Sequence, residues 1–110
     1  MSTAASDSAD ARDFGLSDED LALLWRIFAL YLPGATVSVF GSRARGTHRT
    51  FSDLDLLVDT GARLGVHVLG ELQDALDASR LPMRVDVLDA RGDATEFVAR
   101  VRSECVALGP

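Results

Sequence analysis

Apolar residues return every three or four positions along the first ordered part of the chain, from residue 21 to residue 31. The recurring residues are Leu21, Leu24, Trp25, Phe28 and Tyr31. This spacing is typical of a helix with one buried face. Ser17 and Asp20 form a capping-box pattern at the start, and the run Leu32-Pro33-Gly34 stops the element. We therefore predict a helix over residues 17–32 that packs on a sheet.

Shorter runs rich in valine and leucine predict strands over residues 35–41, 52–60 and 83–90. An amphipathic pattern over residues 65–79 predicts a second helix between the last two strands. A further capping pattern, Asp93 with Glu96, predicts a last helix. Periodicity leaves open whether residues 105–108 end as helix or as an edge strand. The order of elements predicts an α+β fold, close to α/β, with helices packed on one face of the sheet.

Length and composition add a domain boundary to this pattern. The chain has 110 residues, of which 47% are hydrophobic and 25% charged, as expected for one globular domain. Residues 1–15 are rich in Ser, Ala and Asp and read as an acidic flexible tail, which leaves residues 16–110 as the domain. No apolar stretch approaches the roughly 20 residues that span a bilayer. We expect no membrane partner, no secretion and a cytoplasmic location.

The charge balance narrows the classes of function. The chain has 11 basic and 17 acidic residues, a formal net charge of -6, which argues against direct nucleic-acid binding. Every basic residue is arginine, so Schiff-base chemistry and the phosphate-loop lysine are excluded. The single cysteine, Cys105, cannot form an internal disulfide.

A candidate anion site follows the first predicted strand directly, in the run Gly41-Ser42-Arg43-Ala44-Arg45-Gly46. A strand that ends in Gly-Ser before a short helical turn presents main-chain N–H groups and a hydroxyl. Residues 41–50 also hold three arginines and no acidic residue, and arginine forks match phosphate oxygens. Taken alone, a surface turn with solvated charges is the more common meaning of such a run.

Acidic residues in the next strands strengthen this interpretation. Strand alternation places Asp53 and Asp55 on one face, where two carboxylates repel unless a cation lies between them. Mg²⁺ is the usual cation for such oxygen ligands. Asp86 interrupts the third apolar strand, and a neighbouring strand position would bring it beside the pair. The sequence thus predicts three converging carboxylates near an arginine-rich loop.

In combination these motifs resemble the minimal nucleotidyltransferase family of the DNA polymerase beta-like superfamily. The run at residues 41–46 is followed, after five residues, by Ser52-Asp53-Leu54-Asp55-Leu56-Leu57-Val58 and later by Val85-Asp86-Val87. The resemblance spans residues 17–108. It implies the nucleotidyltransferase fold, a short mixed sheet with two helices on one side and a nucleoside triphosphate bound across the sheet edge.

The resemblance also implies roles for seven residues. Gly41 and Ser42 would contact the β- and γ-phosphates of ATP, and Arg43 and Arg45 would neutralise the triphosphate or the departing pyrophosphate. The remaining three would hold two Mg²⁺ ions and carry catalysis: Asp53, Asp55 and Asp86. Two metal ions that clamp the attacking and leaving oxygens suit an in-line displacement of this kind.

For function, the resemblance implies a protein adenylyltransferase that is the antitoxin of a HEPN-domain ribonuclease toxin. Such an enzyme would transfer AMP from ATP to a tyrosine of the toxin and form a hetero-oligomer with it. One alternative is nucleotidylation of a small molecule such as an aminoglycoside. Another is an antitoxin without catalysis that acts by binding alone. The acceptor, the base preference and the number of groups transferred are not encoded in any motif.

Overall fold

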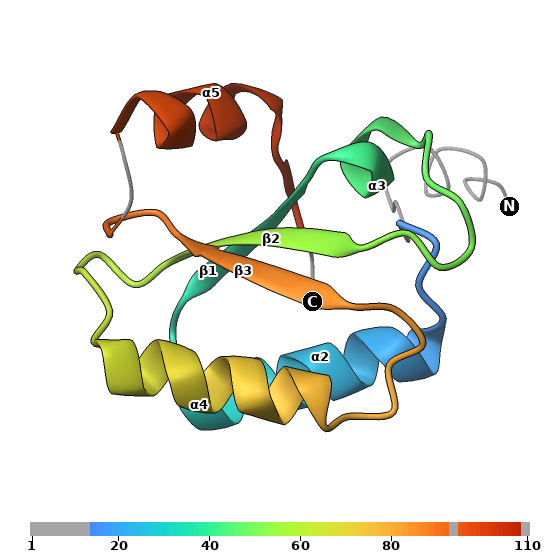
Figure 1. Cartoon of the computed structure of the whole chain (residues 1–110), viewed down its shortest axis with the longest axis horizontal. Coiled ribbons are helices and arrows are strands. Elements are labelled where there is room, and N and C mark those ends of the chain that lie inside the picture. The colour runs from blue at the N-terminus through green and yellow to red at the C-terminus, as the bar shows by residue number, and fades with distance from the viewer. Residues whose placement is uncertain (1–13, 93–94, 109–110) are drawn as a thin grey trace, which may run out of the picture.

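The computed structural model describes residues 14–92 and 95–108. Its elements in chain order are α2 (Asp18–Tyr31), β1 (Thr36–Phe40), α3 (Ser42–Arg45), β2 (Leu54–Asp59), α4 (Val66–Asp77), β3 (Val85–Asp89), α5 (Thr95–Glu104) and β4 (Val106–Ala107). The four strands form one sheet in the order β3-β2-β1-β4. β2 and β3 run parallel, whereas β1 is antiparallel to both β2 and β4. The predicted mixed sheet is confirmed (Figure 1).

The first helix begins where the capping pattern predicts. The Asp20 amide donates to Ser17 Oγ at 3.0 Å, and the Ser17 amide donates to Asp20 Oδ2 at 3.3 Å. Three acidic residues fill its first turn, where negative charge favours the helix dipole. The helix ends at Tyr31, and the following Leu32 amide caps the Phe28 carbonyl.

The main core lies between the sheet and the helices α2 and α4, which both cover its lower face in Figure 1. Alternate strand residues point into this core, because successive side chains of a strand face opposite sides. The fully buried members are Leu24, Phe28, Val39, Leu54, Leu56, Val58, Leu72 and Val85. The prediction that two helices share one face is confirmed for α2 and α4.

The last helix, α5, instead lies over the opposite face of the sheet, above it in Figure 1. Leu57 is the reason, since it stands between the inward-facing Leu56 and Val58 and therefore points to the other side. There it forms a second, smaller cluster with Val98 and Val101 of α5. Leu57, with the partly buried Phe40, Leu88 and Ala90, thus gives this face an apolar surface on which α5 packs.

Two ion pairs at Asp59 also hold α5 and the turn after β3 to the sheet. Asp59, at the end of β2, accepts from Arg91 Nε at 3.0 Å and from Arg102 Nη2 of α5 at 2.8 Å. Hydrogen bonds from these two arginines hold the pKa of Asp59 far below its usual range. The carboxylate therefore stays ionised and keeps both pairs formed.

Both ends of the described chain depart slightly from the expected boundaries. Phe14 is only 5% exposed, so the packed domain begins two residues before the predicted residue 16. The rest of the predicted tail and the predicted Asp93 cap lie outside the described residues. The open question at the C-terminus is settled as a strand, because Val106 and Ala107 pair with β1.

No helix in the described part of the chain combines the length and apolarity that a membrane crossing requires.

Candidate functional site

The predicted site residues meet at one end of the sheet. Phe40, the last residue of β1, is the register partner of Asp55 in β2, and Asp55 is the register partner of Asp86 in β3. Gly41 therefore leaves β1 directly beside Asp55. Because Leu54 and Leu56 point into the main core, Asp55 points to the opposite face, which α5 covers only in part.

The three predicted carboxylates influence one another electrically. The pKa of Asp55 is raised, first by burial and then by the negative charges of Asp86 and Asp53. The positive charge of Arg45 partly opposes this shift. The fold thus brings Asp55 and Asp86 side by side on adjacent strands, and Asp53 and Arg45 close enough to influence the pKa of Asp55.

Gly41 is required by the close approach of Asp55. Its φ is +76°, a region that favours glycine, and a Cβ built there would lie 2.6 Å from Asp55 Oδ2. No side chain therefore fits between the β1 end and the carboxylate. This contact assigns Gly41 a steric role that the sequence motif alone does not give.

Replacing Gly41 with alanine is expected to destabilise the fold by about 1–3 kcal/mol, because backbone strain and the clash with Asp55 add together. Chemical denaturation measures this change. Gly46→Ala is the matched control, since Gly46 has a φ of +77° but no atom within 4 Å of its built Cβ. Equal losses for the two variants would show that the Asp55 contact carries no cost.

Ser42 and Arg45 remain at the surface of the site. Both belong to the one-turn helix α3, with Ser42 half-buried and Arg45 exposed. The Arg45 Nη1 lies 3.7 Å from Glu104 Oε1 at the end of α5, in an exposed pair that contributes little stability. Arg45 is thus free to turn towards an anion at the site.

Arg43 departs from the expectation that it contacts the triphosphate. Its side chain is buried, 2% exposed, and donates to three main-chain carbonyls. Nη1 reaches Phe14 at 2.8 Å, Nη2 reaches Thr50 at 3.1 Å and Ser52 at 2.9 Å, and Nε reaches Ser52 at 3.0 Å. Burial lowers the pKa of this guanidinium. Arg43 therefore connects the loop before β2 to the segment that leads into α2. Its guanidinium N–H groups already donate to main-chain carbonyls.

The donor set fits a hard divalent cation, although its present arrangement does not form a complete site. Within residues 14–92 and 95–108, no three His, Cys, Asp or Glu side chains are arranged to hold one metal ion together. Asp86 Oδ1 instead accepts from Arg84 Nε at 2.9 Å. The Arg84 side chain is 70% exposed, so this pair is easily broken. Oxygen-only ligands with unneutralised charge are those that Mg²⁺ prefers.

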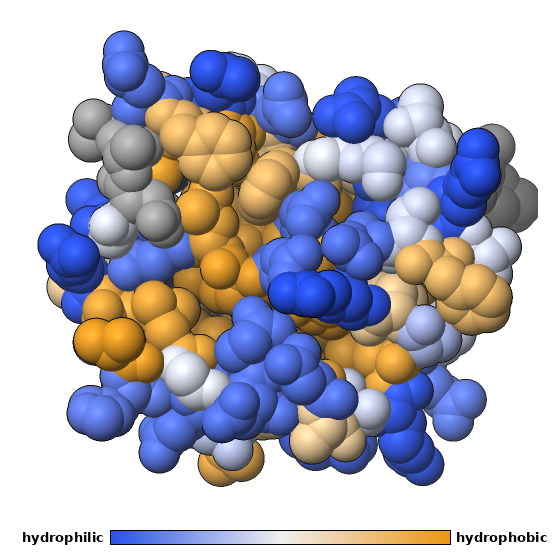
Figure 2. Space-filling view, viewed as in Figure 1, coloured by the Kyte–Doolittle hydropathy of each residue, from blue (hydrophilic) through white to orange (hydrophobic). Residues whose placement is uncertain are grey.

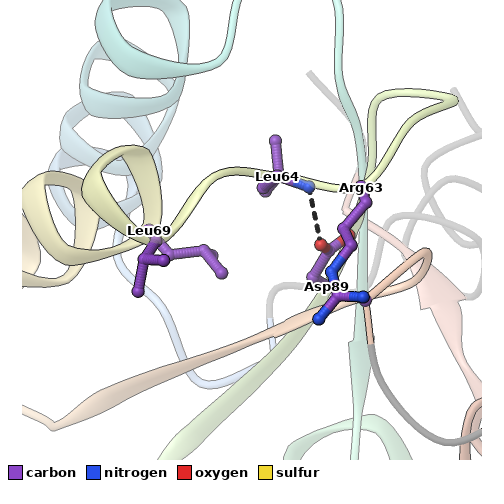
Figure 3. A pocket seen from close by; sticks show the side chains of 6 residues that line it. Arg63, Leu64, Leu69 and Asp89 are labelled. Carbon is purple, nitrogen blue, oxygen red and sulfur yellow. Dashed lines mark hydrogen bonds between the residues drawn. The ribbon is translucent and has the colours of Figure 1, made fainter.

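A pocket of about 220 Å³ lies at the other end of β3 (Figure 3). The buried Asp89 forms part of its wall and accepts from the amides of Leu64, at 2.9 Å, and Arg91, at 3.0 Å. From its place at the end of a strand, Asp89 is expected to be a solvated strand end, and its 3% exposure contradicts this expectation. The signal was present as Asp89-Ala90-Arg91-Gly92 after a strand, a pattern in which an aspartate accepts from its own turn.

Comparison with known proteins agrees with this arrangement. The family model described as "Polymerase beta, Nucleotidyltransferase" matches residues 26–108. A relative from Haemophilus influenzae, named probable protein adenylyltransferase MntA, is 33% identical over 93 residues, which are 84% of this chain and 82% of the relative.

Two solved structures share the fold. A toxin–antitoxin crystal structure with AMP-PNP superimposes with a TM-score of 0.69 and 26% identity, over 82% of this chain and 73% of the other. A mutant MntA–HpeT toxin–antitoxin structure gives a TM-score of 0.66 and 24% identity, over 81% and 71% of the two chains. At that identity the second likeness concerns the fold alone.

Proposed function

The chain belongs to the polymerase beta nucleotidyltransferase family, and from this membership we propose that it transfers AMP from ATP to a tyrosine of a HEPN ribonuclease toxin, with Mg²⁺, and so neutralises the toxin. One observation carries the proposal. Asp55 and Asp86 lie in register on adjacent strands, with Asp53 close enough to raise the pKa of Asp55. Carboxylates placed in this way beside a glycine turn provide ligands for a metal–triphosphate complex.

Each site residue has a role in this proposal. Asp53, Asp55 and Asp86 hold Mg²⁺, which, when bound, neutralises charge on the phosphates and eases deprotonation of the attacking hydroxyl. Gly41 and Ser42 lie where the triphosphate would approach the end of β1. Arg43 has no direct part, because its donors are engaged by main-chain carbonyls.

Arg45 is the side chain best placed to neutralise the negative charge that develops on the leaving phosphates. It is exposed, it acts on Asp55 electrostatically, and within the described part of the chain only a 3.7 Å surface pair with Glu104 restrains it. We propose that Arg45 binds the departing pyrophosphate. An arginine keeps its charge at any working pH and matches phosphate oxygens with its fork.

The transfer itself is a substitution at phosphorus. The tyrosine oxygen forms a bond to the α-phosphorus of ATP, and the bond from that phosphorus to the oxygen bridging to the β-phosphate breaks. Pyrophosphate leaves with the electron pair, and the hydroxyl proton passes to Asp86 or to water. The enzyme's contribution is chiefly to hold the reacting oxygens in line and to stabilise the charge that develops.

The proposed partner follows from the relatives and from charge. The relative at 33% identity is named a probable protein adenylyltransferase, and the solved neighbour at 26% identity is a toxin–antitoxin structure with AMP-PNP. The net charge of -6 is complementary to a basic, RNA-cleaving protein and would speed the encounter of the two chains.

The test is the intact mass of the HEPN protein encoded by the adjacent gene, after incubation with this chain, ATP and Mg²⁺. We expect a gain of one or more adenylyl groups, and none when α,β-methylene ATP replaces ATP, because the bond that must break is then absent. A stable complex without any gain in mass would contradict catalysis and favour neutralisation by binding.

A further inference from the structure

One edge of the sheet is open along β3. Among residues 14–92 and 95–108, no strand pairs with the outer side of β3. At its two ends, the Arg84 carbonyl accepts from Leu54 and the Ala90 amide donates to Val58, so the even-numbered residues face β2. Val87, midway between them, therefore directs both its N–H and its C=O towards the open side.

The rest of this edge is partly closed by one side chain and one main-chain amide. Gln73 Nε2 of α4 donates to the Val85 carbonyl at 2.7 Å, and the Asp89 carbonyl accepts from Gly92 at 3.2 Å. What stays available at the centre is one donor and one acceptor on the same residue, Val87. An added antiparallel strand satisfies such a residue by exchanging two hydrogen bonds with the residue opposite it.

Apolar side chains flank the open edge on both faces of the sheet. Figure 2 shows them gathered over α5, the middle of β3 and the first turn of α4. Val66 is 84% exposed and Phe97 is 44% exposed, and Val87 and Leu88 between them are half-buried. We call these four residues the edge band. Exposed apolar residues beside unpaired main-chain groups mark a surface that an extended peptide can cover.

The edge band ends at the 220 Å³ pocket, between the start of α4 and the end of β3 (Figure 3). Its lining residues are Arg63, Leu64, Val66, Leu69, Asp89 and Gly92. A cavity of roughly 150 Å³ accommodates a benzene molecule, so this pocket has room for one aliphatic or aromatic side chain. Arg63 at its rim is exposed and has no ion-pair partner among the described residues.

The pocket and the catalytic carboxylate lie on the same strand. Asp86 and Asp89 are three residues apart, which is about 10 Å along a strand. Because three is an odd number, their side chains point to opposite faces of the sheet. A strand added to this edge alternates in the same way, so it can present one side chain to Asp86 and another to the pocket.

We propose that the open edge of β3 binds an extended segment of the acceptor protein and so delivers the acceptor hydroxyl to Asp86. The segment pairs with Val87, places an apolar side chain in the pocket three residues away from the acceptor residue, and sets a carboxylate beside Arg63. This inference rests on the proposed function, and it adds where and in what form the protein substrate is held.

Charge favours an acidic acceptor segment over a second copy of this chain. In antiparallel pairing centred on Val87, residue 89 of one copy opposes residue 85 of the other. Residue 86 likewise opposes residue 88, so the Asp86 carboxylates of the two copies would lie diagonally across from each other on one face and repel. A segment that carries a carboxylate instead neutralises the unpaired Arg63.

The test compares Val66→Glu with Leu30→Glu as its matched control. Both positions are exposed leucine or valine residues on helices, but Leu30 lies on α2, outside the edge band. Glutamate at position 66 stands in the first turn of α4, where it favours the helix, so the variant is expected to fold. Far-UV circular dichroism and thermal unfolding verify this for both variants.

We expect Val66→Glu to lower kcat/KM for the acceptor protein by about tenfold or more, as when a central apolar contact is removed. The KM for ATP should change less than about twofold, because the variant leaves the carboxylates and Gly41 untouched. Leu30→Glu should leave both values at the wild-type level. Equal transfer rates in all three proteins would overturn the edge proposal while the adenylyl transfer itself stands.

The remaining outcomes also decide between the two proposals. If the wild type binds the partner without transferring AMP and Val66→Glu alone loses the complex, docking stands and the enzymatic proposal falls. If light scattering shows that the wild type is a dimer and that only Val66→Glu dissociates it, a second copy of the chain occupies the β3 edge and the proposal is wrong. A wild-type chain that neither binds nor modifies the partner overturns both.

The register gives a second, independent readout. Peptide mapping of the modified acceptor should find an apolar residue three positions from the adenylylated residue. Replacing that apolar residue of the acceptor with aspartate should lower AMP transfer as much as Val66→Glu does. An acceptor site without such a residue on either side, or one insensitive to its replacement, would contradict the proposed register.

Discussion

Replacing Asp55 with asparagine is expected to reduce AMP transfer by about a thousandfold or more and, at the same time, to stabilise the metal-free fold. Loss of a metal ligand removes several kcal/mol of charge stabilisation in the transition state, and each 1.4 kcal/mol is a factor of ten in rate. The ionised Asp55 carboxylate destabilises the folded chain when no metal is bound, since burial and the charges of Asp86 and Asp53 raise its pKa.

The direction of the pH effect follows from that raised pKa. A folded chain that holds the Asp55 proton more tightly than the unfolded chain loses stability as the pH rises through the shifted pKa. Asparagine carries no such proton. The stability gap between the variant and the wild type should therefore widen from acidic to neutral pH, when both are measured by denaturation in the presence of a chelator.

Asp74→Asn is the control for this experiment. It removes the same charge from an exposed position on α4, outside the site, and should leave both transfer and stability nearly unchanged. If Asp55→Asn were destabilising without metal, Asp55 would be a structural residue. If it retained transfer, the assignment of the metal site would be wrong.

Replacing Arg43 with methionine is expected to destabilise the fold by about 3–5 kcal/mol. The variant leaves the carbonyls of Phe14, Thr50 and Ser52 without their donor in a buried or part-buried setting, and each unsatisfied group carries a desolvation cost. Lysine should rescue only part of this loss, because one ammonium cannot reproduce the planar fork. Urea denaturation of the metal-free chain measures both variants.

Arg49→Met provides the matched control, since Arg49 lies in the same loop with an exposed side chain. It should cost less than about 0.5 kcal/mol. The opposite pattern, with unchanged stability of Arg43→Met and at least a tenfold weaker affinity for ATP, would return Arg43 to the phosphate-binding role that its sequence position suggests.

The fold was largely predictable because its elements carry local signals. The Ser17–Asp20 capping box, the valine-rich strands and the amphipathic helix α4 each correspond to a described element whose bounds differ by one or two residues. The pairing of Asp55 with Asp86 was also predictable, since a parallel neighbouring strand is enough to bring these two residues together.

What the sequence did not reveal depends on contacts between distant segments. In a run of glycine, serine and arginine, Arg43 looks like its exposed neighbour Arg45, and only the meeting of Phe14, Thr50 and Ser52 around it explains its burial. The face chosen by α5 depends likewise on Leu57, which a local pattern cannot distinguish from the leucine beside it.

The weak attachment of α5 has a consequence for how the molecule opens. This helix rests on a small cluster, with three buried residues and a few partly buried ones, and on the ion pair of Arg102 with Asp59, which dissolved salt screens. The helices and strands of the main core share a far larger buried cluster. Local unfolding free energy therefore differs across the sheet, and α5 can detach while the other face stays folded. In that opened state Leu57 and Leu88 become accessible to solvent on the face that α5 covers. That face can therefore change its structure more easily than the face covered by α2 and α4.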